Sequence, residues 1–235
     1  MMFKKIALLF ICFQLVACTE LQSVLDAASS GTGLTSEQIG KGLKEALKVG
    51  IGKGSDRLSS LDGYLGSQYK ILLPEDAQKV TNKLKRIPGF SKVEDKMIER
   101  INRAAEDAAK SAKPIFVSAI KQMSFQDAMG ILKGDKNAAT NFLNKATYSQ
   151  LYAKFQPVIV KALNKQKALD YWSDAVTAYN KIPLTQKMNP QLDDYITNRA
   201  LDGLFAMVAK EEINIRSNAA ARTSKLLKDV FAMQD

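Results

Sequence analysis

The chain has 235 residues, of which 46% are hydrophobic, and it carries 34 Lys and Arg against 24 Asp and Glu. It contains no histidine, so it lacks the side chain that titrates near neutral pH and serves most often as a metal ligand. This composition excludes Ser-His and Cys-His catalysis and imidazole metal sites, and we expect neither a cofactor nor a bound metal.

The first 17 residues have the layout of an export signal: two lysines, a mostly apolar run, and the small residue Ala17 before Cys18. The apolar run is shorter than the roughly 20 residues that a membrane-spanning helix needs. Residues 15–18, Leu-Val-Ala-Cys, resemble a bacterial lipobox. The resemblance implies cleavage before Cys18 and acylation of the new N-terminal cysteine by diacylglyceryl and N-acyl chains such as palmitate.

The expected product is a lipoprotein, because two or more acyl chains hold a protein on a membrane durably whereas one chain binds reversibly. An ordinary secreted protein that is cut elsewhere is the alternative. Thr19 stands where an aspartate signals inner-membrane retention in Gram-negative lipoproteins, so the resemblance implies the periplasmic face of the outer membrane. Cys12 leaves with the signal and Cys18 is acylated, so no disulfide is expected.

Residues 18–34 are expected to form the acylated cysteine and a flexible tether, because the stretch 27–33 offers almost no apolar anchor. Fully extended, the tether would span on the order of 50 Å. Once Lys4 and Lys5 leave with the signal, the net charge is about +8, which either serves solubility or attracts anionic lipid headgroups. No nucleic acid partner is expected, since basic and acidic residues are interleaved.

Almost every segment after the tether repeats its apolar residues at helical rather than strand spacing. No stretch shows the alternation between turn dipeptides that strands require. The fold class is therefore predicted to be all-α, a multi-helix bundle that forms a single domain over residues 35–235. Helices are predicted from Ser36 to about Lys53, from Pro74 to Ile87, from Ser91 to a kink or restart at Pro114, over Phe125–Lys133, from Asp135 to about Lys145, over Ser149–Asn164 with a bend at Pro157, and over Leu169–Lys181, Asp194–Arg216 and Thr223–Met233.

Two helix starts have clear capping residues. Thr35 and Gln38 have the spacing of a capping box, in which each side chain satisfies a backbone N–H of the other residue. Ser124 is expected to cap the short helix 125–133, with Asp127 at its third position. These signals fix where the two helices begin.

The boundaries of other segments are less sharply marked. Gly50, Gly52 and Gly54 are expected to loosen the end of the first helix, with close packing as the alternative role for these glycines. Residues 55–70 are a turn-rich passage to which no structure is assigned. The segment Asp194–Arg216 is apolar nearly all round. A helix of that kind is expected to be central and enclosed by its neighbours.

Two groups of short motifs stand out: Lys113-Pro114-Ile115-Phe116 with Met123-Ser124-Phe125-Gln126-Asp127-Ala128 and Ile131-Leu132, and Tyr195-Ile196-Thr197 with Ala200-Leu201-Asp202-Gly203-Leu204-Phe205, Glu211-Glu212, Ile215-Arg216 and Ala221-Arg222-Thr223. They resemble an uncharacterised bacterial family, domain of unknown function 4197, from about residue 36 to the end. Members generally carry an export or lipoprotein signal, so the resemblance implies the compartment. It implies no activity and no functional residues.

Two acids lie inside apolar runs and are the candidate site residues, Asp127 and Asp202. A carboxylate taken out of water needs a charged or hydrogen-bonding partner. The structural interpretation is that Asp127 caps amides near Ser124 and that Asp202 pairs with an arginine. The functional interpretation is an acidic spot in a cleft, where two carboxylates within about 10 Å would make catalysis arguable. The arginines available as partners are Arg103, Arg199, Arg216 and Arg222.

Three functions remain open on this sequence. The leading one is a non-catalytic, lipid-anchored binding or scaffold module of the cell envelope, with a protein or envelope component as its partner. The second is a carrier that holds a lipid or another apolar ligand inside the bundle. The third is a carboxylate-dependent enzyme. A cavity of several hundred Å³ lined by Phe and Met would favour a carrier, and an exposed apolar patch over a packed interior would favour a partner site.

Overall fold

The computed structural model describes residues 35–84, 91–165 and 192–232, together with Trp172, Ser173, Thr177, Pro183 and Lys187. These described residues contain helices and turns and no strand, so the predicted all-α class is confirmed. The helices are α3 (Ser36–Leu58), α4 (Glu75–Leu84), α5 (Val93–Ala109), α6 (Ala112–Gln122), α7 (Phe125–Lys133), α8 (Ala138–Asn164), α10 (Leu192–Ser217) and α11 (Lys225–Phe231), with a 3-10 turn η1 (Ala219–Ala221) before the last.

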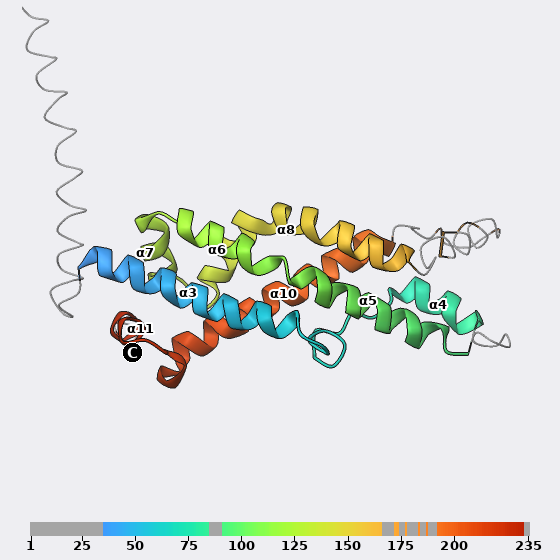
Figure 1. The fold of residues 1–235 in the computed structure, drawn as a ribbon, viewed down its shortest axis with the longest axis horizontal. Coiled ribbons are helices and arrows are strands. Elements are labelled where there is room, and N and C mark those ends of the chain that lie inside the picture. The colour runs from blue at the N-terminus through green and yellow to red at the C-terminus, as the bar shows by residue number, and fades with distance from the viewer. Residues whose placement is uncertain are drawn as a thin grey trace, which may run out of the picture.

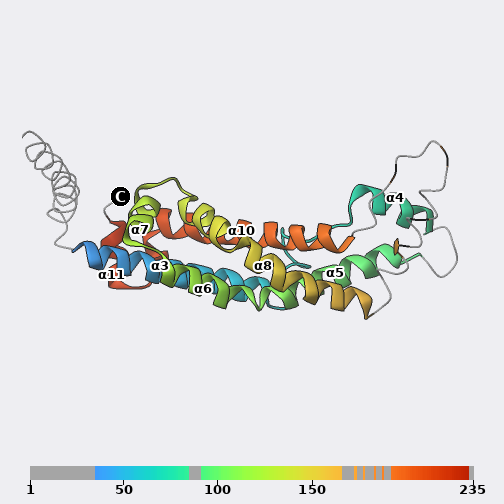
Figure 2. The same ribbon diagram turned by 90° about the horizontal axis from the view of Figure 1, so that it is seen from above.

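The helices form an elongated bundle in which α3, α5, α6, α8 and α10 run along the long axis (Figure 1). Helix α10 packs on α8 and α3, and α8 also packs on α5 and α6. Helices α5 and α6 follow one another nearly in line, and the start of α3 lies with α7 and α11 at the end of the bundle opposite α4 (Figure 2). No helix in this described part of the chain is long and apolar enough to cross a membrane.

The sequence predicted the start of α3 correctly and its end wrongly. Thr35 and Gln38 form the expected capping box, with hydrogen bonds of 3.2 Å and 2.7 Å. The helix does not loosen near residue 53 but continues to Leu58. Gly50 and Gly54 lie one turn apart where α10 approaches, and a Cβ at Gly50 would come within 2.9 Å of Ile215 Cδ1. These glycines therefore permit close helix packing rather than a helix end.

Helix α8 is one continuous helix, although two were predicted over its length. Its buried residues recur at every fourth position: Ala139, Leu143, Thr147, Leu151, Phe155, Ile159 and Leu163. Four residues turn an α-helix through about 400°, so the buried stripe rotates by about 40° at each step. The helix thereby meets α6, α5 and α10 with different sides along its length. Pro157 lies inside the helix but is exposed, so water can reach the carbonyl that lacks its donor.

The remaining predictions match to different degrees. The break before Pro114 is confirmed, because α5 ends at Ala109 and α6 restarts at Ala112. The predicted helix 169–181 lies almost wholly outside the described residues, as do residues 1–34 with Cys18 and the segment 85–90.

Helix α10 is enclosed only in part, which corrects the expectation of a fully surrounded helix. Twelve of its residues are buried, but residues spaced by three or four positions form an exposed face: Arg199, Asp202, Ala206, Lys210 and Ile213. The helix therefore has a solvent side despite its apolar composition.

Candidate functional site

The connection between α3 and α4, residues 59–74, is a surface loop with a defined path, here named the α3–α4 loop. It covers most of the passage to which the sequence assigned no structure. Asp62 has a φ of 65°, in the left-handed region. A Cβ added to Gly63 would lie 2.4 Å from the carbonyl oxygen of Leu58. Only glycine fits this turn without a change in the backbone.

A buried carboxylate from α5 holds the first half of the loop. Glu106 is 5% exposed, and its Oε1 accepts hydrogen bonds from the backbone N–H groups of Tyr64 and Leu65 at 3.1 Å and 3.2 Å. Its Oε2 pairs with Arg103 at 2.8 Å. Arg103 also pairs with Asp62 at 2.9 Å, and the hydrogen bond to Glu106 raises the pKa of the arginine. The carboxylate and the arginine together fix the turn.

Two buried polar side chains hold the rest of the loop. The Tyr64 hydroxyl donates to the carbonyl oxygen of Ala200 at 2.7 Å, and burial raises the pKa of this tyrosine. Its ring packs against Gly203, where an added Cβ would lie 2.9 Å from Cε1. The Asn102 amide accepts from the Ile71 N–H at 2.8 Å and donates to the Ile71 carbonyl at 2.9 Å. The loop is therefore fastened to α5 and α10 along its length.

The α3–α4 loop displays apolar side chains to solvent. Leu61 is 76% exposed and Leu72 is 52% exposed. Within the described residues, the other exposed large hydrophobic side chain is Ile213 of α10, at 38%. Because the loop is already fixed, burial of Leu61 by a partner would cost little further loop entropy.

Asp127 has the capping role expected of it. Its Oδ2 accepts from the Ser124 backbone N–H at 2.9 Å and from the Ser124 hydroxyl at 2.7 Å, while the Asp127 N–H donates to Ser124 Oγ at 3.1 Å. These hydrogen bonds from Ser124 hold the pKa of Asp127 below its usual value. The predicted start of α7 is therefore confirmed.

Asp202 is not buried, and the expectation that it lies in the apolar interior is wrong. It pairs with Arg199 at 3.2 Å, and both side chains are more than half exposed. Its neighbours in sequence, Leu201 and Gly203, are buried, but neighbours in a helix do not share a face. The carboxylate therefore belongs to the solvent side of α10.

Arg216 and Arg222 bind helix ends rather than the two candidate acids. Arg216 pairs with Glu212 at 2.9 Å and donates to the carbonyl oxygen of Ile131 at the end of α7 at 2.7 Å. Arg222 donates to the carbonyls of Ile215 and Arg216 at the end of α10. The four arginines thus have four separate surroundings.

Sequence reasoning missed Glu212, which joins three helices. Its carboxylate accepts hydrogen bonds from the backbone N–H groups of Ala139 and Thr140 at 2.9 Å and 2.8 Å, and from the Thr140 hydroxyl at 2.8 Å. An anion is favoured at this position, because the first turn of α8 presents free N–H groups. Together with Arg216 it connects α10 to the start of α8 and the end of α7.

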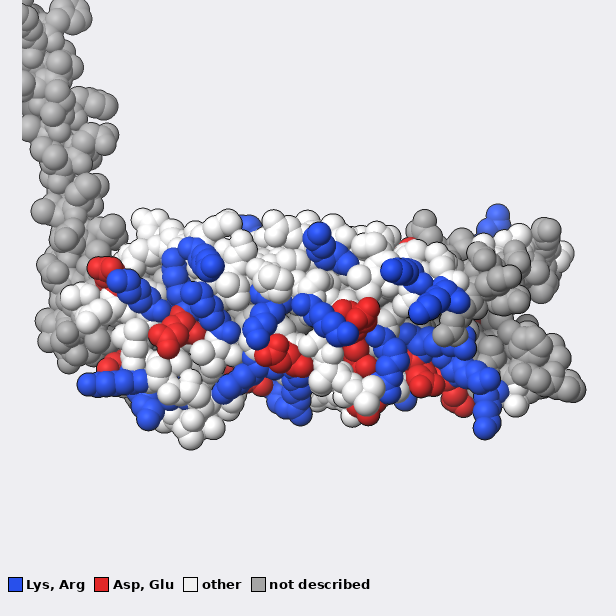
Figure 3. Space-filling model, in the orientation of Figure 1, with Lys and Arg blue, Asp and Glu red and all other residues white. Residues whose placement is uncertain are grey.

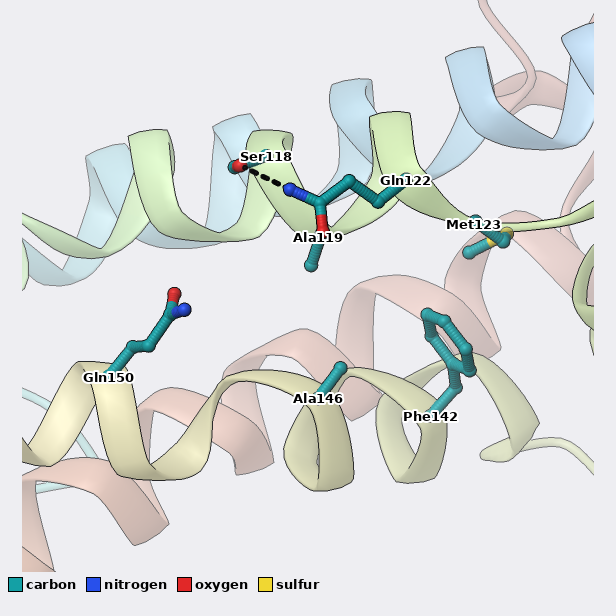
Figure 4. A pocket seen from close by; sticks show the side chains of 7 residues that line it. All are labelled: Ser118, Ala119, Gln122, Met123, Phe142, Ala146 and Gln150. Atoms are coloured by element: carbon teal, nitrogen blue, oxygen red, sulfur yellow. Dashed lines mark hydrogen bonds between the residues drawn. The ribbon is translucent and has the colours of Figure 1, made fainter.

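A second candidate site is a half-open pocket of about 180 Å³ between α6 and α8. Figure 4 shows Gln122 and Gln150 on opposite walls of this pocket, with Gln122 hydrogen-bonded to Ser118. The other lining residues are Ala119, Met123, Phe142 and Ala146, and no lining side chain is charged. The pocket is smaller than the roughly 300–1,000 Å³ of typical small-molecule sites, and its residues lie at ordinary helical spacing, which gives no sequence signal.

The fold and the site define an all-helical single-domain protein that holds a surface loop with buried polar side chains. Within the described residues no cluster of acids or cysteines could hold a metal ion. The model of the family described as a protein of unknown function, DUF4197, matches residues 33–232, and the chain belongs to this family. No curated protein and no solved structure matches the chain.

Proposed function

We propose that this chain is a lipid-anchored, non-catalytic binding module of the cell envelope, and that it holds a protein partner through the α3–α4 loop. The observation that carries the proposal is the 76% exposure of Leu61 on a loop that Glu106, Arg103 and Tyr64 hold in place. Full burial of a leucine contributes roughly 1.5–3 kcal/mol to an interface. Such a residue can be an interface anchor when its loop is already ordered.

The two candidate acids and the two buried glutamates have structural roles, which favours binding over catalysis. Asp127 caps α7, Asp202 pairs with Arg199 on the surface, and Glu106 and Glu212 are buried as hydrogen-bond acceptors for backbone amides. Each of these four carboxylates thus has a structural partner, and Asp127 and Asp202 have no partner in common. General acid–base catalysis would need a carboxyl group that faces a substrate site.

The proposed anchor is acylated Cys18 on the periplasmic face of the outer membrane. The support is the lipobox-like ending of the first 18 residues and the threonine that follows it. Cys18→Ala is expected to abolish labelling with a palmitate analogue and to release the protein from membranes. Cys12→Ala is the matched control, because it removes the other cysteine of the chain, and it should leave both properties intact. Membrane retention of an unlabelled Cys18→Ala protein would contradict the anchor.

Site-specific photocrosslinking tests the proposed partner site. A photoreactive residue at position 61 is expected to form a discrete protein adduct in intact envelopes, whereas the same residue at position 213, the control exposed position on α10, is not. Leu61→Asp should weaken binding of the partner. The measured quantity is the yield of the adduct that a photoreactive residue at Gln68, on the same loop, forms with the partner. Both positions 61 and 213 are exposed, so neither change should affect folding. Equal crosslinking from positions 61 and 213 would refute the loop as the site.

A carrier for an apolar group is the second candidate function, and the α6–α8 pocket favours it. Met123 and Phe142 lie on opposite walls at one end of the pocket, and Gln150 lies toward its other end (Figure 4). A pocket of about 180 Å³ has room for the end of one acyl chain rather than for a whole lipid. Ala146→Phe fills the pocket from an exposed position, so it should abolish binding of a fluorescent fatty acid. Binding unchanged by this variant would refute the carrier.

A further inference from the structure

The charges of the chain are distributed unevenly, and helix α8 lies in an acid-free stretch. Residues 136–169 contain six lysines and no Asp or Glu, in a chain that has 24 acidic residues. Figure 3 shows the consequence on one face of the molecule: acidic side chains gather over its lower half, while the upper edge, where α8 runs in the same orientation, is mostly blue and white.

Three lysines form one line along the second half of α8: Lys154, Lys161 and Lys165, here named the lysine stripe. They are spaced by seven and four residues, so they project from the same side of the helix, and all three are exposed. Lys145 lies nine residues before Lys154 and therefore projects from nearly the opposite side. The stripe spans about 16 Å along the helix axis.

None of the three lysines of the stripe has an ion pair among the described residues. The ion pairs among the described residues join α3, α4, α5, α6, α10 and the α3–α4 loop, and none of them involves α8. Lys110, for comparison, pairs with Asp107 at 2.8 Å. An acid three or four residues from a lysine on a helix can pair with it, and no Asp or Glu stands at these spacings from the three lysines of the stripe. The stripe leaves its positive charge uncompensated, which complements an anionic surface.

We propose that the lysine stripe contacts the anionic phospholipid headgroups of the membrane and lays the bundle along the bilayer. A lysine near an anionic membrane surface contributes about a fivefold gain in the ratio of docked to undocked molecules. Three lysines together contribute on the order of a hundredfold. The contact depends on the lipid anchor of the proposed function for its local concentration, but not on the partner of the α3–α4 loop.

This orientation agrees with the position of the α3–α4 loop. Helix α8 runs along one long side of the bundle and the loop lies on the other side (Figure 1). The described chain begins at Thr35, at the end of the bundle that contains α7 and α11 (Figure 1). With α8 on the membrane, Leu61 faces the periplasm.

The test uses the mature acylated protein in nanodiscs of phosphatidylethanolamine with or without phosphatidylglycerol. The chain has two cysteines. In the proposed mature form Cys12 has left with the signal and Cys18 is acylated, so an introduced cysteine is the only free thiol. A donor dye is attached at Ala153→Cys beside the stripe or at Ser60→Cys on the loop, and energy transfer to headgroup-labelled lipid is measured. In discs with phosphatidylglycerol, we expect strong transfer from position 153 and weak transfer from position 60. In discs without it, this difference should be absent.

Charge reversal separates the stripe from the overall charge. The variant K154E/K161E/K165E should lower the docked-to-undocked ratio at least a hundredfold and abolish the transfer from position 153. The control K48E/K53E/K210E changes the net charge equally at exposed positions outside α8 and should change the transfer little. Equal transfer in neutral and anionic discs, or equal loss in both variants, would overturn the proposal. A failed anchor is seen separately as protein that does not co-elute with discs, and a failed partner site as equal crosslinking from positions 61 and 213.

Discussion

Replacing Glu212 with Gln perturbs the junction of α7, α8 and α10 most directly. The carboxylate accepts three hydrogen bonds from Ala139 and Thr140 at 2.8–2.9 Å and pairs with Arg216 at 2.9 Å. A glutamine turns one acceptor into an N–H₂ donor that faces other donors, and it removes the negative charge opposite Arg216. Loss of one partner of a buried ion pair destabilises a protein by about 3–5 kcal/mol, and this is the loss that we expect for Glu212→Gln.

The assay is urea unfolding followed by circular dichroism at neutral pH. Asp202→Asn is the control, because its ion pair with Arg199 is exposed, and it should change the free energy of unfolding by less than about 0.5 kcal/mol. The double variant Glu212→Gln with Arg216→Met should recover part of the loss, since the two residues are coupled. A Glu212→Gln protein within about 1 kcal/mol of the wild type would refute this account of the junction.

Three further changes test the loop and the capping box. Gly203→Ala should destabilise by about 1–2 kcal/mol, because its Cβ would lie 2.9 Å from the Tyr64 ring and the clash outweighs the gain in helix propensity. Tyr64→Phe should cost about 1 kcal/mol at pH 7 through the lost hydrogen bond to Ala200. The difference in the free energy of unfolding between the wild type and Tyr64→Phe should narrow above about pH 10. Burial raises the pKa of Tyr64 in the folded protein, so ionisation of the unfolded chain at high pH removes the stabilisation that the neutral tyrosine gives. Asp127→Asn should cost about 0.5–1 kcal/mol at pH 7. The difference should begin to shrink as the pH falls below about 4 and should disappear as the pH passes the folded pKa of Asp127, because that pKa lies below the unfolded value.

Thermal and urea unfolding over a range of pH measure all three. Gly130→Ala is the control for Gly203, because a Cβ at Gly130 would meet nothing within 4 Å, and it should stabilise α7 by about 0.5–1 kcal/mol. Equal effects of the two alanines would contradict the packing of Tyr64 on Gly203. If the free energy of unfolding of Tyr64→Phe or Asp127→Asn differs from that of the wild type by the same amount at every pH, the substituted side chain does not change its pKa on folding.

Local signals in the sequence were enough for the fold class and for several helix starts. The capping boxes at Thr35 and Ser124 depend only on residues three positions apart, and both are present. Helix α8 was divided wrongly because its buried stripe rotates, so a fixed face fits only part of its length. The end of α3 was misplaced because the role of Gly50 and Gly54 depends on α10, which is distant in sequence.

The candidate acids show why linear context fails within a helix. Asp202 follows the buried Leu201 directly, but Arg199 and Ala206, three and four positions away along the helix, are both exposed. Glu212 lies four residues after Val208 and three before Ile215, both of which are buried. That spacing was the available signal for a buried carboxylate. The path of the α3–α4 loop had no such signal, because it depends on long-range contacts from α5 and α10.

The side chains of α10 that bind the ends of α7 and α8 have a consequence for local motion. Terminal turns usually fray, and their amide protons exchange with solvent before those of the core. At the start of α8 the amides of Ala139 and Thr140 are buried and donate to Glu212 of a distant helix. These amides should exchange with deuterium only when α10 separates from α8, so the first turn of α8 should be as protected as its middle.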